Sequence, residues 1–399
     1  MTTNELSLIK ESGSGKMFNT GDDVIQVLQL QGSWREMGRQ YGTFAKEGMQ
    51  QVWDASVQPF LDKGWTTLAD AEELFGRRTF DSSSFRMREI MRGVADAVGW
   101  STDKVAVLNQ SFVMTIYQAK LHTMAGCSSI LAWGDATPHG GMITARNLDW
   151  GESFLPFPLY FTVCNPTDGS NAIANLSWPG FLLASSMVNE KGVYMDTHDG
   201  TSMGGNVVYI DRASILNAFI DLMVECDHAE AVSNRLNTLR NDASWIFTVA
   251  DSTPNGFSFE CPTSDSRRRN ADGDTMAIVN TYINPDWGIH KRETVSNSLR
   301  RFDNLNARLA ESRGKIDATK AMDIFDTPLF NEDGTFKENG GATKVKKIDA
   351  DITVHQIVTD LSELKVWLKI PQKTEWREVD LKKLFTDYFL KQRNERKKK

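Results

Sequence analysis

The chain has few cysteines. Cys127, Cys164, Cys226 and Cys261 are the four among 399 residues, and they lie far apart. Because they form no Cys-x-x-Cys pair and no Cys/His spacing typical of zinc ligands, we expect neither a metal nor another cofactor. Four cysteines are also too sparse for a scaffold built on disulfides. A special role for one of them must therefore come from its neighbours in the sequence.

Long apolar runs and an excess of positive charge are also missing. No uninterrupted run of 18 apolar residues occurs, which excludes an obvious membrane-spanning helix. A net charge of -7 and a pI near 5.5 argue against a nucleic-acid partner, because such proteins concentrate Lys and Arg. The charge favours small or neutral partners, and assembly into a homo-oligomer stays open.

The beginning of the chain has no charged, apolar and small-residue regions of a signal peptide. The stretch from Ser12 to Lys16 reads like a linker, so a natural leader could have been replaced. The sequence as written predicts a soluble, cytoplasmic protein, or an exported one if a leader has been removed.

What is present is a globular composition, with 40% hydrophobic and 24% charged residues. After a predicted strand at 24–31, apolar residues recur at helical spacing through most of 34–125. Beyond Gly126, short β-rich runs separated by turns predict a multi-stranded sheet, followed by a helical pair at 210–240 and further strands and helices. Since this order lacks a regular βαβα alternation, it favours an α+β sandwich.

The most informative stretch is residues 125–150, AGCSSILAWGDATPHGGMITARNLDW. Two β-like runs flank the turn GDATPHGG, which predicts a hairpin. Cys127 begins the first strand, and Arg146 and Asp149 end the second, so antiparallel pairing would return a cation and a carboxylate to the thiol. A nearby Arg lowers the pKa of a thiol, and a carboxylate can orient an amine. We therefore predict that Cys127 is a nucleophile.

Each of these residues also has an ordinary structural interpretation. A lone Cys is most often a small buried core residue. Arg146 and Asp149 could form a cross-strand ion pair without a catalytic role. The choice between the two interpretations depends on what surrounds the motif.

The strings Gly-Cys-Ser-Ser-Ile and Ala-Arg-Asn-Leu-Asp-Trp resemble the start of the mature chain in the acyl-CoA:6-aminopenicillanic acid acyltransferase-like group of the N-terminal-nucleophile hydrolases. Bile-salt (choloylglycine) hydrolases and acid ceramidase are similar relatives. The resemblance continues in the same order over most of the chain, in GSWREMGRQYG, NEKGVYM, IFTVAD with FSFE, IVNTY and SLRRF.

This resemblance implies a four-layer αββα sandwich with a mostly helical N-terminal segment, residues 1–126, and a catalytic part, residues 127–399. It also implies an inactive precursor in which the Cys127 thiol attacks the Gly126 carbonyl and the peptide shifts to a thioester. Hydrolysis would leave Cys127 as a new N-terminus. Its α-amine, with an unperturbed pKa of about 7.7 to 8.0, would serve as the general base.

The same matching implies roles for other residues. Arg146 would hold the thiolate or the substrate, Asp149 would bind the Cys127 amine, and Asn280 would donate to the oxyanion. As an alternative, Asn280 could be a turn residue in an Asx-turn.

Two further matches are Asn189, which corresponds to a strand-end Asn, and Arg301, which corresponds to a late Arg near the catalytic residues. Asn189 in NEKG also has the form of a plain turn residue. Arg292 and Arg300 are rivals of Arg301 for the same place.

Aromatic residues beyond the nucleophile, Trp150 and Phe154 among them, belong either to the core or to the wall of an apolar acyl pocket. The predicted function is a self-processed cysteine amidohydrolase or acyltransferase that forms an acyl-thioester on Cys127. We expect it to act on linear amide bonds of a small acylated amide substrate. One alternative is a lipid amidase or phospholipase-B-like esterase with the same machinery. Another is a binding protein that keeps the fold and never cleaves itself.

Overall fold

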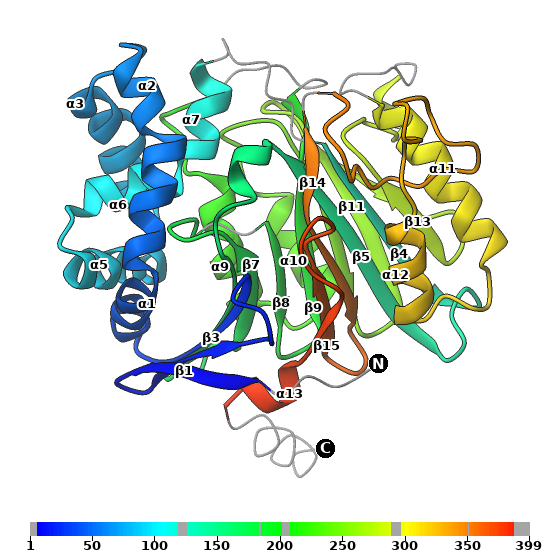
Figure 1. The fold of residues 1–399 in the computed structure, drawn as a ribbon, viewed down its shortest axis with the longest axis horizontal. Coiled ribbons are helices and arrows are strands. Elements are labelled where there is room, and N and C mark those ends of the chain that lie inside the picture. Colours follow the sequence, from blue (N-terminus) through cyan, green and yellow to red (C-terminus); the bar gives the residue numbers. More distant parts are fainter. Residues whose placement is uncertain are drawn as a thin grey trace.

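The computed structural model describes residues 6–118, 126–182, 185–201, 208–288, 297–349 and 351–386. Two β-sheets pack face to face, and helices cover the outer face of each sheet (Figure 1). The expected α+β, four-layer αββα sandwich is thereby confirmed. In the described part of the chain, no helix combines the length and the apolar character needed to cross a membrane.

The larger sheet has the order β1-β2-β3-β6-β7-β8-β9-β10-β11-β12. Its neighbours pair antiparallel except β3 and β6, which run parallel from Ile25 opposite Leu159 to Gly32 opposite Pro166. The strands are β1 (Ser7–Ser12), β2 (Gly15–Asn19), β3 (Ile25–Gly32), β6 (Leu159–Pro166), β7 (Ile173–Ser177), β8 (Ser186–Asn189), β9 (Val193–Asp199), β10 (Trp245–Asp251), β11 (Asn255–Cys261) and β12 (Arg267–Asn270).

The smaller sheet has the order β13-β4-β5-β14-β15-β16 and is antiparallel throughout. Its strands are β13 (Thr275–Ile278), β4 (Cys127–Gly134), β5 (Gly140–Trp150), β14 (Ile352–Asp360), β15 (Lys365–Lys369) and β16 (Arg377–Asp380). The predicted hairpin is confirmed, because Cys127 of β4 lies opposite Leu148 of β5.

The helices form the two outer layers and the connections. On the larger sheet lie α1 (Trp34–Ser56), α9 (Ile215–Glu225) and α10 (Ala229–Leu236), and on the smaller sheet α11 (Ser298–Glu311) and α12 (Ala318–Asp326). The others are α2 (Gln58–Asp62), α3 (Leu68–Ala71), the π-helical η1 (Glu72–Arg77), α4 (Arg78–Ser82), α5 (Phe85–Val98), α6 (Thr102–Asn109), α7 (Ser111–Gln118), the 3-10 turns η2 (Glu152–Phe154) and η3 (Pro285–Trp287), and α13 (Leu381–Leu384).

Residues before and after Gly126 fold as one unit. The eight paired residues of β3 and β6 join the N-terminal segment to the rest of the larger sheet. The interpretation of Ser12 to Lys16 as a linker is wrong, because Ser12 ends β1 and Gly15 and Lys16 begin β2, with Gly13 at φ +59° in the tight turn between them. Since β1 is exposed along its length, it has no apolar alternation from which the sequence could have revealed it.

Alternation along β4 separates two chemical environments. Cys127, Ser129 and Leu131 face the space between the sheets, where Leu131 packs in the main core. Ser128 and Ile130 face the helical layer formed by α11 and α12. The nucleophile predicted from sequence therefore points between the sheets.

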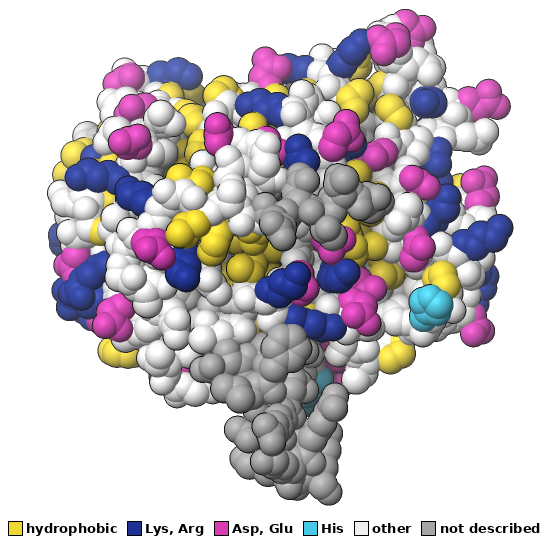
Figure 2. Space-filling model, turned by 60° about the horizontal axis from the view of Figure 1, so that its bottom comes forward, with side chains coloured by type: hydrophobic (Ala, Val, Ile, Leu, Met, Phe, Trp, Pro, Cys, Tyr) yellow, Lys and Arg dark blue, Asp and Glu magenta, His cyan; other side chains and the backbone are white. Residues whose placement is uncertain are grey.

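Charges of both signs cover the surface. The face in Figure 2 intersperses Lys and Arg with Asp and Glu, and apolar side chains occupy part of its middle. Neither sign forms a continuous stripe on this face. The view therefore shows a surface of mixed charge.

Candidate active site

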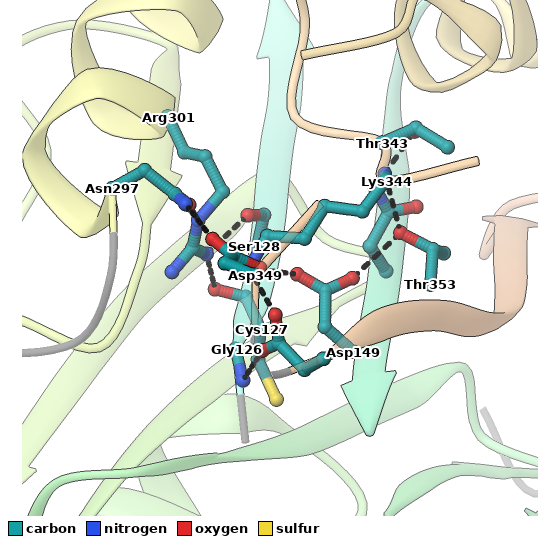
Figure 3. A network of polar contacts seen from close by, with 12 residues as sticks. Gly126, Cys127, Ser128, Asp149, Asn297, Arg301, Thr343, Lys344, Asp349 and Thr353 are labelled. Carbon is teal, nitrogen blue, oxygen red and sulfur yellow. Dashed lines mark hydrogen bonds and ion pairs between the residues drawn. The ribbon is translucent and has the colours of Figure 1, made fainter. Parts of the chain in front are cut away.

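The peptide between Gly126 and Cys127 is held by hydrogen bonds on its acyl side (Figure 3). The Gly126 carbonyl accepts the Asp149 backbone N–H at 2.7 Å. The Gly126 N–H donates to Oδ2 of Asp351 at 2.8 Å. This arrangement fixes the Gly126 carbonyl beside the thiol-bearing residue.

Gly126 is packed too closely to carry a side chain. A Cβ at this position would lie 2.7 Å from Asp149 Oδ2 and 2.8 Å from Asp351 Oδ2, well inside normal contact distances. A larger residue at this position would displace two carboxylates, which approach the backbone from β5 and from the residue before β14.

Arg146 lies next to the Cys127 thiol, as the hairpin predicted. Its Nη2 is 3.5 Å from Sγ and also donates to the Thr197 carbonyl at 2.5 Å, and its Nη1 donates to Ser186 Oγ at 2.8 Å. The guanidinium is fully buried between the sheets. Strands from both sheets therefore orient it toward the sulfur.

The pKa of the Cys127 thiol differs from the expectation that Arg146 lowers it overall. Burial raises the pKa of Cys127 to about 11, and Arg146 lowers it by less than burial raises it. The expectation that Arg146 makes the thiolate abundant is therefore wrong for the uncleaved chain. The physical reason is that Cys127 is only 2% exposed, so the charged form loses its hydration.

Asn280 and Arg301 contact the backbone of the nucleophile. The Cys127 N–H donates to Asn280 Oδ1 at 2.8 Å, and Arg301 Nη2 donates to the same oxygen at 3.1 Å. Arg301 Nη1 donates to the Cys127 carbonyl and, at 2.7 Å, to Ser128 Oγ. Asn280 Nδ2 donates to the Asp199 carbonyl at 3.0 Å. The amide oxygen of Asn280 thus faces the Cys127 nitrogen, while its donor nitrogen faces the Asp199 carbonyl.

The structure separates Arg301 from its rivals. Arg301 is buried on the face of α11 that also carries Leu305, four residues on. Arg300 is exposed and lies over the Phe336 ring. Arg292 lies outside the described residues.

Asn189 does not contact this cluster. Its Nδ2 donates to the carbonyls of Met223 and Cys226, both at 2.8 Å. Its Oδ1 accepts the N–H groups of Lys191 at 3.0 Å and Val193 at 2.9 Å. These bonds match the turn interpretation, and they tie the β8–β9 turn to the end of α9. A catalytic role for Asn189 gains no support from its position.

A buried charge cluster surrounds the Asp149 carboxylate (Figure 3). Asp149 Oδ1 accepts Thr353 Oγ1–H at 2.6 Å, and its Oδ2 lies 3.8 Å from Lys344 Nζ. Lys344 also contacts Asp351, and it lies 3.7 Å from Asp349. Burial, together with the charge of Asp149, raises the pKa of Asp351 to about 6, although Lys344 opposes the shift. Sequence reasoning missed Asp351 and Lys344, because they follow α12 in a segment with no motif.

A second polar network lies between the sheets, behind the thiol. Ser129 Oγ donates to Asp196 at 2.7 Å, and His198 Nε2 lies 2.9 Å from the other Asp196 oxygen. Although burial opposes it, the interactions with His198 and Arg146 lower the pKa of Asp196 to about 2. Ser129 and Asp196 both approach Nε2 of His198, so the trio lacks the geometry of a Ser-His-Asp triad. It joins β4 to β9 and places a carboxylate near Arg146.

A cavity opens beside Cys127 and Arg146. Its apolar wall includes the aromatic rings of Phe112, Trp150, Trp178, Phe181 and Trp245, and its polar wall includes Ser177, Ser185, Thr197 and Asp199.

The two aromatic residues expected at the pocket differ in position. Trp150 belongs to the cavity wall. Phe154 is buried outside the wall, with its ring centroid 6.2 Å from that of Trp150 and 4.8 Å from that of Trp178. It supports the lining rather than forming it.

The remaining cysteines have no visible part in the site. Cys226 and Cys261 are buried, Cys164 is partly buried, and all are free thiols like Cys127. Within the described ranges, no group of three or more His, Cys, Asp or Glu side chains is arranged to hold a metal ion.

Comparison with known sequences gives distant relatives, and no family model matches the chain. The chain is 24% identical to protein dcd1B of Dictyostelium discoideum over 44% of this chain and 38% of that protein. It is 26% identical to protein dcd1A of the same organism over 45% of this chain and 46% of that protein. An uncharacterized protein of Archaeoglobus fulgidus is 22% identical over 86% of this chain and 63% of its own length. The chain thus spans less than two thirds of each of these relatives.

Among solved structures, the chain is similar to a mutant of the conjugated bile acid hydrolase of Clostridium perfringens (12% identity, TM-score 0.42, 64% of this chain and 93% of that one). It is also similar to a Caenorhabditis elegans N-acylethanolamine-hydrolyzing acid amidase ortholog (13% identity, TM-score 0.41, 59% of this chain and 93% of that one). Penicillin V acylase from Agrobacterium tumefaciens is a third similar structure (11% identity, TM-score 0.42, 65% of this chain and 89% of that one). At these identities and TM-scores, the likeness assigns no activity to the chain.

Proposed function

We propose that this protein is a cysteine amidohydrolase that activates itself by cleaving the Gly126–Cys127 peptide. The observation that carries the proposal is the Gly126 carbonyl, held by the Asp149 N–H at 2.7 Å directly before a thiol that Arg146 approaches to 3.5 Å. A nucleophile, an acyl carbon and a donor to the carbonyl oxygen are the parts that acyl transfer requires.

Self-cleavage proceeds by an N-to-S acyl shift. The Cys127 sulfur forms a bond to the Gly126 carbonyl carbon, and the negative charge that develops on the oxygen is stabilised by the Asp149 N–H. The carbon–nitrogen bond then breaks, and the Cys127 nitrogen takes up the proton that the thiol loses. Water hydrolyses the resulting thioester, which yields a Gly126 carboxylate and a Cys127 α-amine.

The new amine then acts as the base for substrate turnover. Asn280 Oδ1 already accepts a hydrogen bond from this nitrogen. Asp149 Oδ2 has no hydrogen-bond partner among the described residues and lies against Gly126, the residue that cleavage releases. It can accept a hydrogen bond from the amine N–H and so orient the nitrogen lone pair toward the thiol.

The substrate is a small N-acyl amide whose acyl group enters the aromatic cavity beside Cys127. The thiol forms an acyl-thioester with it, and the leaving amine takes a proton from the α-ammonium. Water, or a second amine in the case of acyl transfer, then releases the acyl group. The paired strands β3 and β6 would keep the two cleaved segments together.

Denaturing mass spectrometry of the full chain tests the proposal. We expect wild-type protein to separate into two chains divided between Gly126 and Cys127, and Cys127→Ala to stay intact. Cys226→Ala is the matched control, because Cys226 is also a buried thiol but lies outside the site. A wild-type chain that remains at 44.8 kDa under maturing conditions would support the binding-protein alternative instead.

A further inference from the structure

Asp199 is a buried carboxylate in the wall of the cavity that contains Cys127. It ends β9 and is only 5% exposed. Its Oδ1 accepts both the N–H of Thr201 at 2.8 Å and the Oγ1–H of Thr201 at 2.6 Å. Within the part of the chain that the structure describes, Oδ2 has no hydrogen bond and the carboxylate has no ion-pair partner.

The position of Asp199 is coupled to the nucleophile. Its backbone carbonyl accepts Asn280 Nδ2–H at 3.0 Å, and Asn280 Oδ1 accepts the Cys127 N–H at 2.8 Å. One residue thus connects the Asp199 backbone to the reacting nitrogen. A ligand that touches the Asp199 side chain would lie in the same cavity as the thiol.

An ionised carboxylate in these buried surroundings costs free energy unless a cation or a hydrogen-bond donor contacts it. Burial raises the pKa of Asp199, since the charged form loses its hydration. The hydroxyls of Ser177 and Ser185 in the same wall carry no charge. Arg146 directs its hydrogen bonds to the thiol, to Ser186 and to the Thr197 carbonyl instead.

The aromatic wall suits the same kind of ligand. Trp245 and Phe112 stack with ring centroids 5.7 Å apart, and Phe112 lies 4.6 Å from Trp150. The π-faces of aromatic rings, Trp above all, attract cations, and they also accept alkyl chains. Carboxylate and rings together therefore favour a group that is partly apolar and ends in a positive charge.

We propose that Asp199 selects amide substrates whose acyl group carries an ammonium, an aminoacyl amide rather than a plain fatty or aromatic acyl amide. The reaction at Cys127 rests on the proposed function, while recognition of the ammonium rests on the cavity alone. Asp199 is then a specificity-determining residue, and its free oxygen accepts a hydrogen bond from the ammonium.

Matched substrates test this inference in the processed enzyme. Coumarin amides of amino-terminated acyl chains are compared with methyl-terminated chains of the same length. We expect kcat/KM to favour the ammonium member of at least one pair by about 10- to 100-fold, the range of a charge-assisted hydrogen bond. In Asp199→Asn this ratio should fall to about one, whereas Asp211→Asn, at an exposed position, should keep the wild-type ratio.

A binding measurement separates recognition from catalysis. Calorimetry with the uncleaved Cys127→Ala chain should show the same preference for the ammonium amide, and the double variant with Asp199→Asn should lose it. If wild type cleaves no amide while this binding preference persists, the proposed function fails and the recognition stands. Equal binding and equal turnover of both members of every pair, or an unchanged ratio in Asp199→Asn, would overturn the inference.

Discussion

Replacing Lys344 with Met tests the physical account of the charge cluster at the Gly126–Cys127 junction. The Lys344 side chain is fully buried and is in contact with Asp351, 3.7 Å from Asp349 and 3.8 Å from Asp149. Met fills a similar volume without the charge. The variant therefore leaves three carboxylates near one another without their shared cation.

The expected loss of stability is large. At an effective dielectric constant of about 20, two unit charges 3.8 Å apart interact by about 4 kcal/mol. Desolvation of the lysine offsets part of its attraction to the carboxylates, and removing one partner of a buried pair typically costs about 3 to 5 kcal/mol. We expect a loss in this range at pH 7.

The loss should shrink in acid. Burial raises the pKa of Asp351 to about 6, so below that pH its carboxyl is neutral in the folded chain and no longer needs the lysine. Lys344 is one of the groups that hold this pKa down, so the pKa of Asp351 rises further in Lys344→Met. The part of the Lys344 contribution that depends on Asp351 is therefore absent below about pH 6 and grows as the pH rises above it.

Urea unfolding followed by tryptophan fluorescence measures the effect, in a Cys127→Ala background that prevents cleavage. Lys346→Met is the matched control, because Lys346 is 55% exposed and pairs with an exposed Glu332, a contact worth at most about 1 kcal/mol. The reasoning is refuted if Lys344→Met costs no more than Lys346→Met, or if its cost is the same at pH 4.5 and pH 7.

Three further predictions concern single residues of the site. If Asn280 donates to the oxyanion, as the resemblance implies, Asn280→Ala should lower kcat of the processed enzyme by about 100- to 1000-fold, and steady-state turnover near the wild-type rate would remove Asn280 from that role. Gly126→Ala should slow self-cleavage at least about tenfold, because the added Cβ contacts two carboxylates and displaces the carbonyl. A time course by mass spectrometry measures the rate. Gly151→Ala is the control and should cleave normally, because the atom nearest to its added Cβ is 3.5 Å away. Asn189→Ala should lower the unfolding free energy by about 1 to 3 kcal/mol yet leave kcat/KM close to wild type, and a 100-fold drop in kcat/KM would restore its catalytic role.

Local sequence was sufficient to predict the hairpin and the pair of residues nearest the thiol. Two β-rich runs around a turn rich in Gly and Pro predict β4 and β5, and antiparallel geometry alone brings Arg146 back to Cys127. The four-layer architecture was expected from the resemblance and agrees with the two packed sheets. These features depend on contacts within a few residues or on patterns repeated along the chain.

Positions that depend on distant segments were harder to predict. Asn189 sits in a strand–turn motif that matches a family string, yet its amide bonds to the end of α9, which no local pattern reveals. Arg300 and Arg301 are adjacent in sequence, and only the packed face of α11 decides that Arg301 is the one that reaches Cys127.

The sequence by itself determined which residue is the candidate nucleophile, what precedes it and which cation returns to it, because all three lie in one hairpin. Tertiary structure decided the electrostatics. Burial between two sheets raises the pKa of the Cys127 thiol despite Arg146. Asp351, which pairs with Lys344, bonds to the Gly126 N–H from more than 200 residues away. Desolvation and long-range charge depend on what packs around a group, so they exist only once the whole chain has folded.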